Sequence, residues 1–149
     1  MSDSKKRCPT CDSKASVVRE RREMTFGRRH VVVDDERMIC PDCKESFYLP
    51  EQLEAVERRA AEQIRRDEGL LTRDEIRAVR RRLGLTQAQF EQLLGVGPKT
   101  VVRWERGSVC QNASADRLMR LVDAYPANAQ FLRTLHGIAP RDEGASMPA

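Results

Sequence analysis

Four of the five cysteines in this 149-residue chain form two pairs with the same spacing. Cys8-Pro-Thr-Cys11 and Cys40-Pro-Asp-Cys43 are C-P-x-C units separated by 28 residues. A two-residue spacing lets both thiolates of one turn point at one ion, and two such turns complete a tetrahedral set of sulfur ligands. The sequence therefore predicts one structural Zn²⁺ per chain, bound by Cys8, Cys11, Cys40 and Cys43.

Other uses of these cysteines remain open. A redox dithiol needs only one C-x-x-C, and no thioredoxin-like βαβ pattern surrounds either pair. Disulfide bonds are rare in the cytosol. His30 competes as a zinc ligand, but four cysteines already fill the tetrahedron, so we expect it in a strand. Cys110 lacks a partner at ligand spacing and is expected to be a small hydrophobic residue.

The residues between the two cysteine pairs predict short antiparallel strands. The strand-like runs are Val17-Val18, Met24-Thr25-Phe26, His30–Val33 and Met38-Ile39. Turns are expected at Gly27-Arg28 and at Asp34-Asp35. This pattern indicates a zinc ribbon whose apolar core is too thin to fold alone, so metal binding supplies the missing stability.

A charged helix is predicted from Pro50 to about Asp67. Leu53, Val56, Ala60 and Ile64 form a narrow apolar stripe among charges of both signs. We expect a solvated helix that covers the ribbon; a partner-binding or dimer helix is the alternative. The first domain is predicted to span residues 1–69.

The stretch from Thr86 to Gly107 predicts a helix, a tight turn and a second helix. Thr86 and Gln89 have the spacing of a capping box, so the first helix begins there. Gly95-Val96-Gly97 is long enough only for a turn. Pro98 is expected at the first position of the second helix and Gly107 at its end. An inward apolar stripe opposite a basic outward face is what a DNA recognition helix needs.

The outward face of this stretch supplies the candidate DNA contacts. Lys99 and Arg103 are four residues apart, so they are expected to share a helix face and to donate to guanine O6/N7. Val102 can touch a thymine methyl group, and the others are placed for phosphates. The predicted contacts are Gln87, Lys99, Thr100, Val102, Arg103 and Arg106.

Composition and charge agree with this division. Net charge is +4, yet residues 1–71 hold 15 Lys/Arg and 15 Asp/Glu, whereas residues 72–136 hold 11 and 6. The positive excess therefore lies on the helix-turn-helix part, as a phosphate-binding surface requires. The sequence has no apolar run of about 18 residues and no secretory signal at its start. We therefore expect a cytoplasmic protein without membrane contact.

The helix-turn-helix stretch resembles the lambda-repressor-like (XRE) family. The motifs that carry the resemblance are L-G-L-T-Q, G-V-G and T-V-V-R-W-E-R-G. It implies an all-α five-helix bundle over residues 70–136 and a buried ion pair between Arg80 and Glu105. One such domain reads only a few base pairs, so we expect a homodimer on a palindromic operator. Residues 137–149 are predicted to be a disordered tail.

The whole arrangement resembles the MqsA (YgiT-type zinc finger/helix-turn-helix) antitoxin family. The motifs are C-P-T-C, T-F-G-R-R, C-P-D-C-K-E-S, R-R-R-L-G-L-T-Q and R-W-E-R-G. The resemblance implies that the zinc domain neutralises a toxin, commonly an mRNA-cleaving ribonuclease. It also implies that the second domain dimerises and represses the operon. Lys99 departs from the asparagine of the best-known members, so the operator sequence is not transferable.

The predicted class is α+β, a small Cys₄ zinc ribbon with a connecting helix followed by the five-helix bundle. The runner-up function is a stand-alone XRE-type regulator with a structural zinc domain. A thiol oxidoreductase or zinc hydrolase is disfavoured, because a Cys₄ site leaves no open coordination position and no catalytic constellation is visible. We therefore expect no enzyme activity. A small ribonuclease-like gene beside this one would favour the antitoxin.

Overall fold

The computed structural model describes residues 6–139 and divides into two compact units, which we call unit 1 and unit 2. Unit 1 ends at Asp67 and unit 2 starts at Glu68, two residues before the boundary expected at Gly69. Unit 1 holds a three-stranded antiparallel sheet and a helix, and the described part of unit 2 holds five helices. The predicted fold class is confirmed. None of the described helices combines the length and the apolar character that a membrane span requires.

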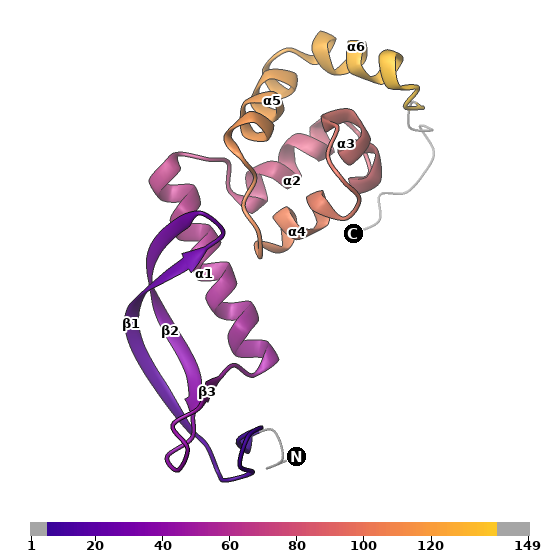
Figure 1. Cartoon of the computed structure of the whole chain (residues 1–149). Coiled ribbons are helices and arrows are strands. Elements are labelled where there is room, and N and C mark those ends of the chain that lie inside the picture. Colours follow the sequence, from indigo (N-terminus) through magenta and orange to yellow (C-terminus); the bar gives the residue numbers. More distant parts are fainter. Residues whose placement is uncertain (1–5, 140–149) are drawn as a thin grey trace. The chain divides into compact units, whose positions relative to one another are not determined.

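A long antiparallel hairpin forms most of unit 1. Strand β1 (Ser16–Phe26) pairs with β2 (Arg29–Ile39), and the short β3 (Ser46–Phe47) adds to the far end of β2. Gly27 has φ +63°, which permits the two-residue connection between the long strands. The turn expected at Gly27-Arg28 is therefore present, and Figure 1 shows the resulting ribbon.

The turn expected at Asp34-Asp35 is wrong, because both residues continue β2. The Asp35 carboxylate is fully buried and accepts a hydrogen bond from Arg37 at 2.8 Å and another from the Tyr48 hydroxyl at 2.8 Å. Arg22, on the neighbouring strand, approaches it at 3.5 Å. Partners from β1 and from beyond β3 thus satisfy a charge that local sequence would leave in a solvated turn.

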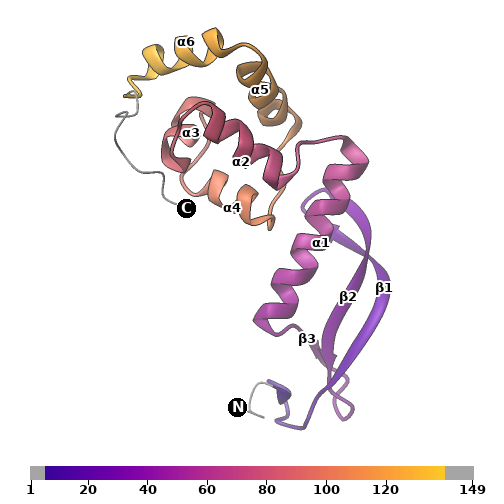
Figure 2. The same ribbon diagram turned by 180° about the vertical axis from the view of Figure 1, so that it is seen from behind.

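Helix α1 (Pro50–Glu68) lies along the hairpin, as Figures 1 and 2 show from opposite sides. It buries Val56, Ala60 and Ile64. Arg59 donates to the backbone oxygen of Asp34 at 3.1 Å. These contacts favour the covering helix over the partner helix, although Leu53 stays 43% exposed instead of joining the buried stripe.

Unit 2 consists of helices around one apolar cluster. They are α2 (Arg73–Arg82), α3 (Gln87–Leu94), α4 (Thr100–Arg106), α5 (Ala113–Ala124) and α6 (Pro126–His136). The largest buried members of the cluster are Phe90, Trp104, Met119, Ile76, Leu85 and Leu93. The capping box of Thr86 and Gln89 is confirmed, with both of its hydrogen bonds at 3.1 Å.

A buried polar group fixes the start of unit 2. Asp116 accepts hydrogen bonds from the Leu71 N–H at 2.8 Å, Gln111 at 3.1 Å and Arg120 at 2.8 Å. Gln111 also donates to the Leu71 oxygen at 2.8 Å. Because both polar groups of Leu71 are paired with side chains, the segment before α2 is held against α5.

The tail predicted at residues 137–149 begins too early. Ile138 is only 7% exposed, belongs to the apolar cluster, and its N–H donates to Arg133 at 2.9 Å. Gly137, with φ +63°, ends α6 and turns the chain so that Ile138 can pack. Residues 140–149 lie outside the described part of the chain.

Candidate metal centre and nucleic-acid interface

The two cysteine pairs lie in turns with the same backbone geometry. In the first, the Cys8 N–H donates to Ser13 and the Asp12 N–H donates back to Cys8, at 2.8 and 2.9 Å. The second repeats this pattern at equal spacing, with Cys40 bonded to Glu45 and Lys44 at 2.9 and 3.0 Å. The fourth residue after each leading cysteine, Asp12 or Lys44, has a positive φ of 60° or 66°. Such repetition indicates two turns built to present sulfur to one point.

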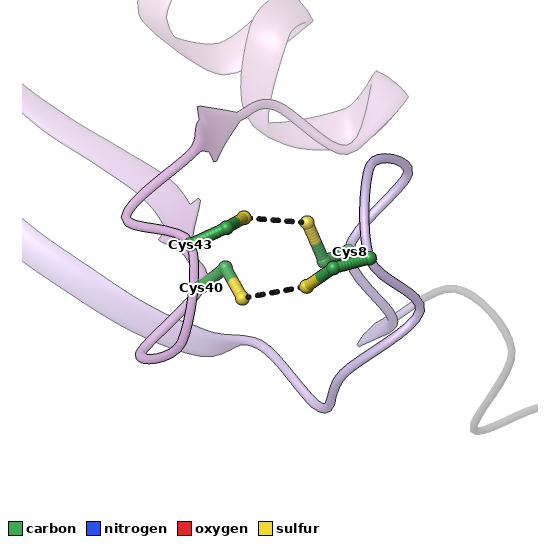
Figure 3. A group of neighbouring side chains, drawn as sticks. Cys8, Cys40 and Cys43 are labelled. Carbon is green, nitrogen blue, oxygen red and sulfur yellow. Dashed lines mark hydrogen bonds between the residues drawn. The ribbon is translucent and has the colours of Figure 1, made fainter.

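The four sulfur atoms gather at that point. All four Sγ atoms lie within 4.8 Å of one another, and the pairs Cys8–Cys43 and Cys11–Cys40 are 3.5 Å apart. Zn–S bonds of about 2.3 Å in a regular tetrahedron place the sulfurs about 3.8 Å apart. Figure 3 shows Cys8, Cys40 and Cys43 directed toward one another. The arrangement fits a tetrahedral thiolate-bound ion.

The exposed cysteines differ in acidity. Hydrogen bonds from the side chain and backbone of Ser13 lower the pKa of Cys11 to about 6. A backbone hydrogen bond from Glu45 lowers the pKa of Cys43, but burial and the neighbouring thiols outweigh it and raise that pKa to about 12. Four thiolates cannot share this space without a cation, so binding of a metal must displace protons.

His30 and Cys110, which were not expected to bind the metal, lie outside the group of four cysteines. His30 is in β2, where its Nδ1 is 3.3 Å from the Thr25 hydroxyl and 3.7 Å from Glu23. Cys110 is half-buried in unit 2. Within residues 6–139, the four cysteines are the one group of His, Cys, Asp or Glu side chains with a metal-binding arrangement.

The helix-turn-helix differs from expectation at the start of its second helix. Helix α3 ends at Leu94 and is capped by Gly95 with φ +71°, but α4 begins at Thr100 and not at Pro98. Lys99 precedes α4 with φ +66°, outside the helical region. The argument that Lys99 and Arg103 share a face by helical spacing is therefore wrong, because only Arg103 is helical.

The faces of α4 divide as the sequence indicated. Val101 and Trp104 are buried in the apolar cluster. Among the predicted DNA contacts, Lys99, Arg103 and Arg106 are exposed, and Gln87, Thr100 and Val102 are half-buried. Arg103 and Arg106 are three residues apart on α4 and share a basic face, whereas Lys99 directly precedes the helix.

A charged network lies beneath that surface. Arg80 donates to both oxygens of Glu105, at 2.6 and 3.3 Å, and to the backbone oxygen of Leu85 at 3.0 Å. Glu105 is 2% exposed, so the implied ion pair is present and buried. Sequence reasoning missed that Gln87 belongs to it: its amide donates to Glu105 at 2.6 Å. The contact depends on how α3 and α4 pack, and no nearby sequence pattern predicts it.

Comparison with known proteins agrees with this arrangement. The family model described as the antitoxin component of bacterial toxin-antitoxin systems, MqsA, matches residues 6–133. A curated relative, Antitoxin MqsA of Escherichia coli (strain K12), is 25% identical over 124 residues, which cover 80% of this chain and 94% of that protein. The family match includes both cysteine turns and the complete helix-turn-helix.

Proposed function

This chain belongs to the MqsA antitoxin family, and from that premise we propose that it is the antitoxin of a type II toxin–antitoxin pair. In this proposal unit 1 binds and neutralises the toxin, an mRNA-cleaving ribonuclease, and unit 2 binds and represses the operator. The protein is cytoplasmic and not an enzyme. The observation that carries the proposal is that the family match extends across both units.

The outer edge of β1 supports a partner role for unit 1. In the strand order β1-β2-β3, β1 is the outer strand along its full 11 residues, and no described strand covers its free side. A long open edge offers unpaired N–H and C=O groups to a strand of another protein. Val17 is 47% exposed, and the Arg19 and Arg21 side chains are 76% and 67% exposed beside it. We assign this edge to the toxin.

The cysteine cluster supports a structural Zn²⁺ in unit 1. Cys8, Cys11, Cys40 and Cys43 would hold it and leave no position open for a substrate. The ion would fix the end of the hairpin where β1 enters the sheet, and with it the position of the edge that we assign to the toxin. Its contribution is stability, not chemistry.

The basic surface of α4 supports a DNA-binding role for unit 2. Arg103 projects from the exposed side of the recognition helix and can donate to guanine bidentately, whereas Thr100 and Arg106 suit phosphates. Gln87 keeps one amide hydrogen for a phosphate while the other bonds to Glu105. The hydrogen bond between Gln87 and Glu105 thereby fixes the position of a phosphate contact relative to α4.

Exposed apolar side chains on the last two helices support a homodimer through unit 2. Leu121 and Tyr125 at the end of α5 are 46% and 62% exposed, and Phe131 and Leu135 of α6 are 64% and 62% exposed. Phe131 and Leu135 are four residues apart and share a face of α6. Two copies joined here would present two recognition helices to a palindromic operator.

Binding of the toxin and of DNA can be tested separately. The gene next to this one should encode a small ribonuclease-like toxin. The full chain should bind that toxin, and a change of the β1 edge, Arg19→Glu with Arg21→Glu, should weaken the complex without altering DNA binding. Toxin binding that survives these changes but is lost on changes to unit 2 would contradict the assignment.

The DNA assignment rests on Arg103. We expect Arg103→Ala to weaken operator binding by roughly 1–3 kcal/mol and to relax the preference at one base pair per half-site. Gln87→Ala should weaken binding evenly across sequences. Measurements on operator and scrambled duplexes at one salt concentration decide the matter, since equal losses for Arg103→Ala on both would show that it contacts phosphate only.

The alternative is a stand-alone XRE-type regulator whose zinc domain is only structural. It predicts the same DNA-binding results but no toxin gene beside this one and no effect of the β1 edge. The open edge of β1 favours the antitoxin, because an edge without a partner is a liability that proteins usually block.

A further inference from the structure

We propose that Arg73, Arg77 and Arg106 form a second phosphate-binding surface, beside the end of the recognition helix. The inference rests on the proposed DNA-binding function and extends it to two residues of α2 that sequence analysis did not select. We call these three residues the α2–α4 arginine cluster. Its ligand is the phosphodiester backbone of double-stranded DNA, independent of base sequence.

Contacts between α2 and α4 place the cluster. The last carbonyl groups of a helix have no partner within it. In α4, the Gly107 N–H donates to the carbonyl oxygens of Arg103 and Trp104, at 3.1 and 3.0 Å. The carbonyl oxygens of Glu105 and Arg106 accept from α2. Arg77 donates to that of Glu105 and Arg73 to that of Arg106, both at 3.4 Å. Two guanidinium groups are thereby gathered at the C-terminus of the recognition helix, where Arg106 adds a third.

The cluster carries more positive charge than its surroundings neutralise. Among the described residues, Glu105 is the carboxylate within 4 Å of Arg77, with its oxygen 3.8 Å from Arg77 Nε. That carboxylate already accepts shorter hydrogen bonds, of 2.6 Å, from Arg80 and from Gln87. Within residues 6–139, neither Arg73 nor Arg106 lies within 4 Å of a carboxylate oxygen. The three guanidinium groups therefore leave a net positive charge that a phosphate group can neutralise.

The donors left over match a phosphate group. A guanidinium has five N–H donors in a rigid fork, and the contact to α4 occupies one of them on Arg73 and on Arg77. The Arg77 side chain is 40% exposed, so its remaining donors face solvent. Phosphodiester oxygens accept such forks bidentately. The cluster lies at one end of a helix that is proposed to enter the major groove. The phosphates of the DNA backbone that line this groove would therefore lie next to the cluster.

Salt dependence of DNA binding by the full chain separates phosphate binding from helix capping. The probe is a short duplex of arbitrary sequence, titrated between about 50 and 200 mM salt. Arg73→Gln and Arg77→Gln each remove the charge and leave a shorter side chain with an N–H donor. We expect each to reduce the slope of log K against log salt by about 0.9 and the double variant by about 1.8. Arg73→Lys and Arg77→Lys should keep the wild-type slope.

Arg66→Gln is the matched control, since Arg66 is an exposed arginine of α1 and its loss removes the same charge. Arg66→Gln should leave the slope unchanged. If it lowers the slope as much as the cluster variants do, the effect comes from the overall charge of the protein and the proposal is overturned. Trp104 fluorescence reports whether unit 2 stays folded. A wild-type slope in the folded double variant would show that the arginines only cap α4. If the wild-type chain binds no duplex, the DNA-binding function itself fails; if Arg103→Ala weakens operator binding but the cluster variants have no effect, only this inference fails.

Discussion

The two units hold their folds together by different means. The described part of unit 2 buries one cluster of 14 apolar residues, from Leu71 to Ile138, and closes its helices with side-chain and glycine caps. Unit 1 has a thinner apolar core, and two of its buried members, Cys8 and Cys40, are candidate metal ligands. Its hairpin also buries Asp35 among arginines. A small unit can therefore replace apolar volume by ligand bonds and ion pairs, at the cost of depending on both.

The comparison teaches where each unit can fail. Apolar burial is distributed, so loss of one contact in unit 2 removes a fraction of the stability. A metal bound by the four cysteines would be concentrated at one point, so loss of one ligand in unit 1 would remove its whole contribution. The single tryptophan, Trp104, lies in the core of unit 2 and reports on that unit alone.

The largest effect is expected on removal of the metal. Structural zinc contributes apparent free energies of about 10 kcal/mol or more in zinc-finger peptides. Chelation or Cys40→Ser should therefore unfold unit 1, seen as loss of β signal in far-UV circular dichroism. Trp104 fluorescence should remain native, because unit 2 does not use the ion.

Elemental analysis supplies the control for this prediction. Purified protein should contain one zinc per chain, and Cys110→Ser should leave that content unchanged. A metal-free protein with a folded unit 1 would show that unit 1, like unit 2, is stable without a metal, which would contradict this prediction.

The next largest effect should come from the buried ion pair between α2 and α4. Arg80→Met leaves Glu105 buried without its main partner, which costs about 3–5 kcal/mol. The double variant Arg80→Met/Glu105→Leu should cost much less, because no buried charge is left unpaired. Urea unfolding followed by Trp104 fluorescence measures both. Small and equal losses from the single and double variants would show that Glu105 does not need Arg80 as a partner.

A smaller, pH-dependent effect is expected at Asp116. Burial raises the pKa of this carboxyl, but hydrogen bonds from the Leu71 N–H, Arg120 and Gln111 outweigh burial, so the pKa is lowered. A lowered pKa means that the ionised group stabilises the fold at neutral pH and that this stability is lost as pH falls through the folded-state pKa. Asp116→Asn should lose about 1.5–3 kcal/mol at neutral pH and very little in strong acid.

Urea unfolding at pH 7 and at pH 2.5 tests the Asp116 prediction. The difference between the wild type and Asp116→Asn should shrink as the pH falls. A constant difference between the two proteins would show that shape, and not charge, explains the loss.

The smallest effect is expected at an exposed pair that links α2 to α5. Arg82 donates two hydrogen bonds to Asp123, at 2.8 and 2.9 Å, but the two side chains are 57% and 30% exposed. Water and salt screen such a pair. Arg82→Met should move the urea midpoint by little more than experimental error, and 1 M salt should remove what remains. A loss comparable to that of Arg80→Met would mean that exposure does not decide the value of ion pairs here.

Features encoded by nearby residues were predictable from the sequence. The cysteine turns, the Thr86 capping box and the Gly95 helix end depend on spacings of a few residues, and all are present. The pairing of Arg80 with Glu105 came from the family pattern, because 25 residues separate the two.

Features decided by distant partners were not predictable. Asp35 stays in a strand because Arg22 and Tyr48 reach it from other segments, whereas its own neighbours favour a turn. Gln87 turns out to bond to Glu105 because two helices cross, and the arginines of α2 become visible as a cluster only once they reach the end of α4. Proline rules alone placed the start of α4 at Pro98, but the connection after Gly95 uses both Pro98 and Lys99.

The left-handed backbone of Lys99 restricts how operator preference can evolve. Glycine and asparagine enter that conformation readily, whereas β-branched side chains are nearly excluded from it. Under the proposed function, backbone sterics therefore limit which amino acids can occupy this position and contact a different base. The asparagine of the best-known family members and the lysine found here are both unbranched at Cβ. Arg103 has an ordinary helical backbone, which accepts most side chains other than proline and glycine, so under the proposed function base preference should change there first and at Lys99 within a narrow set.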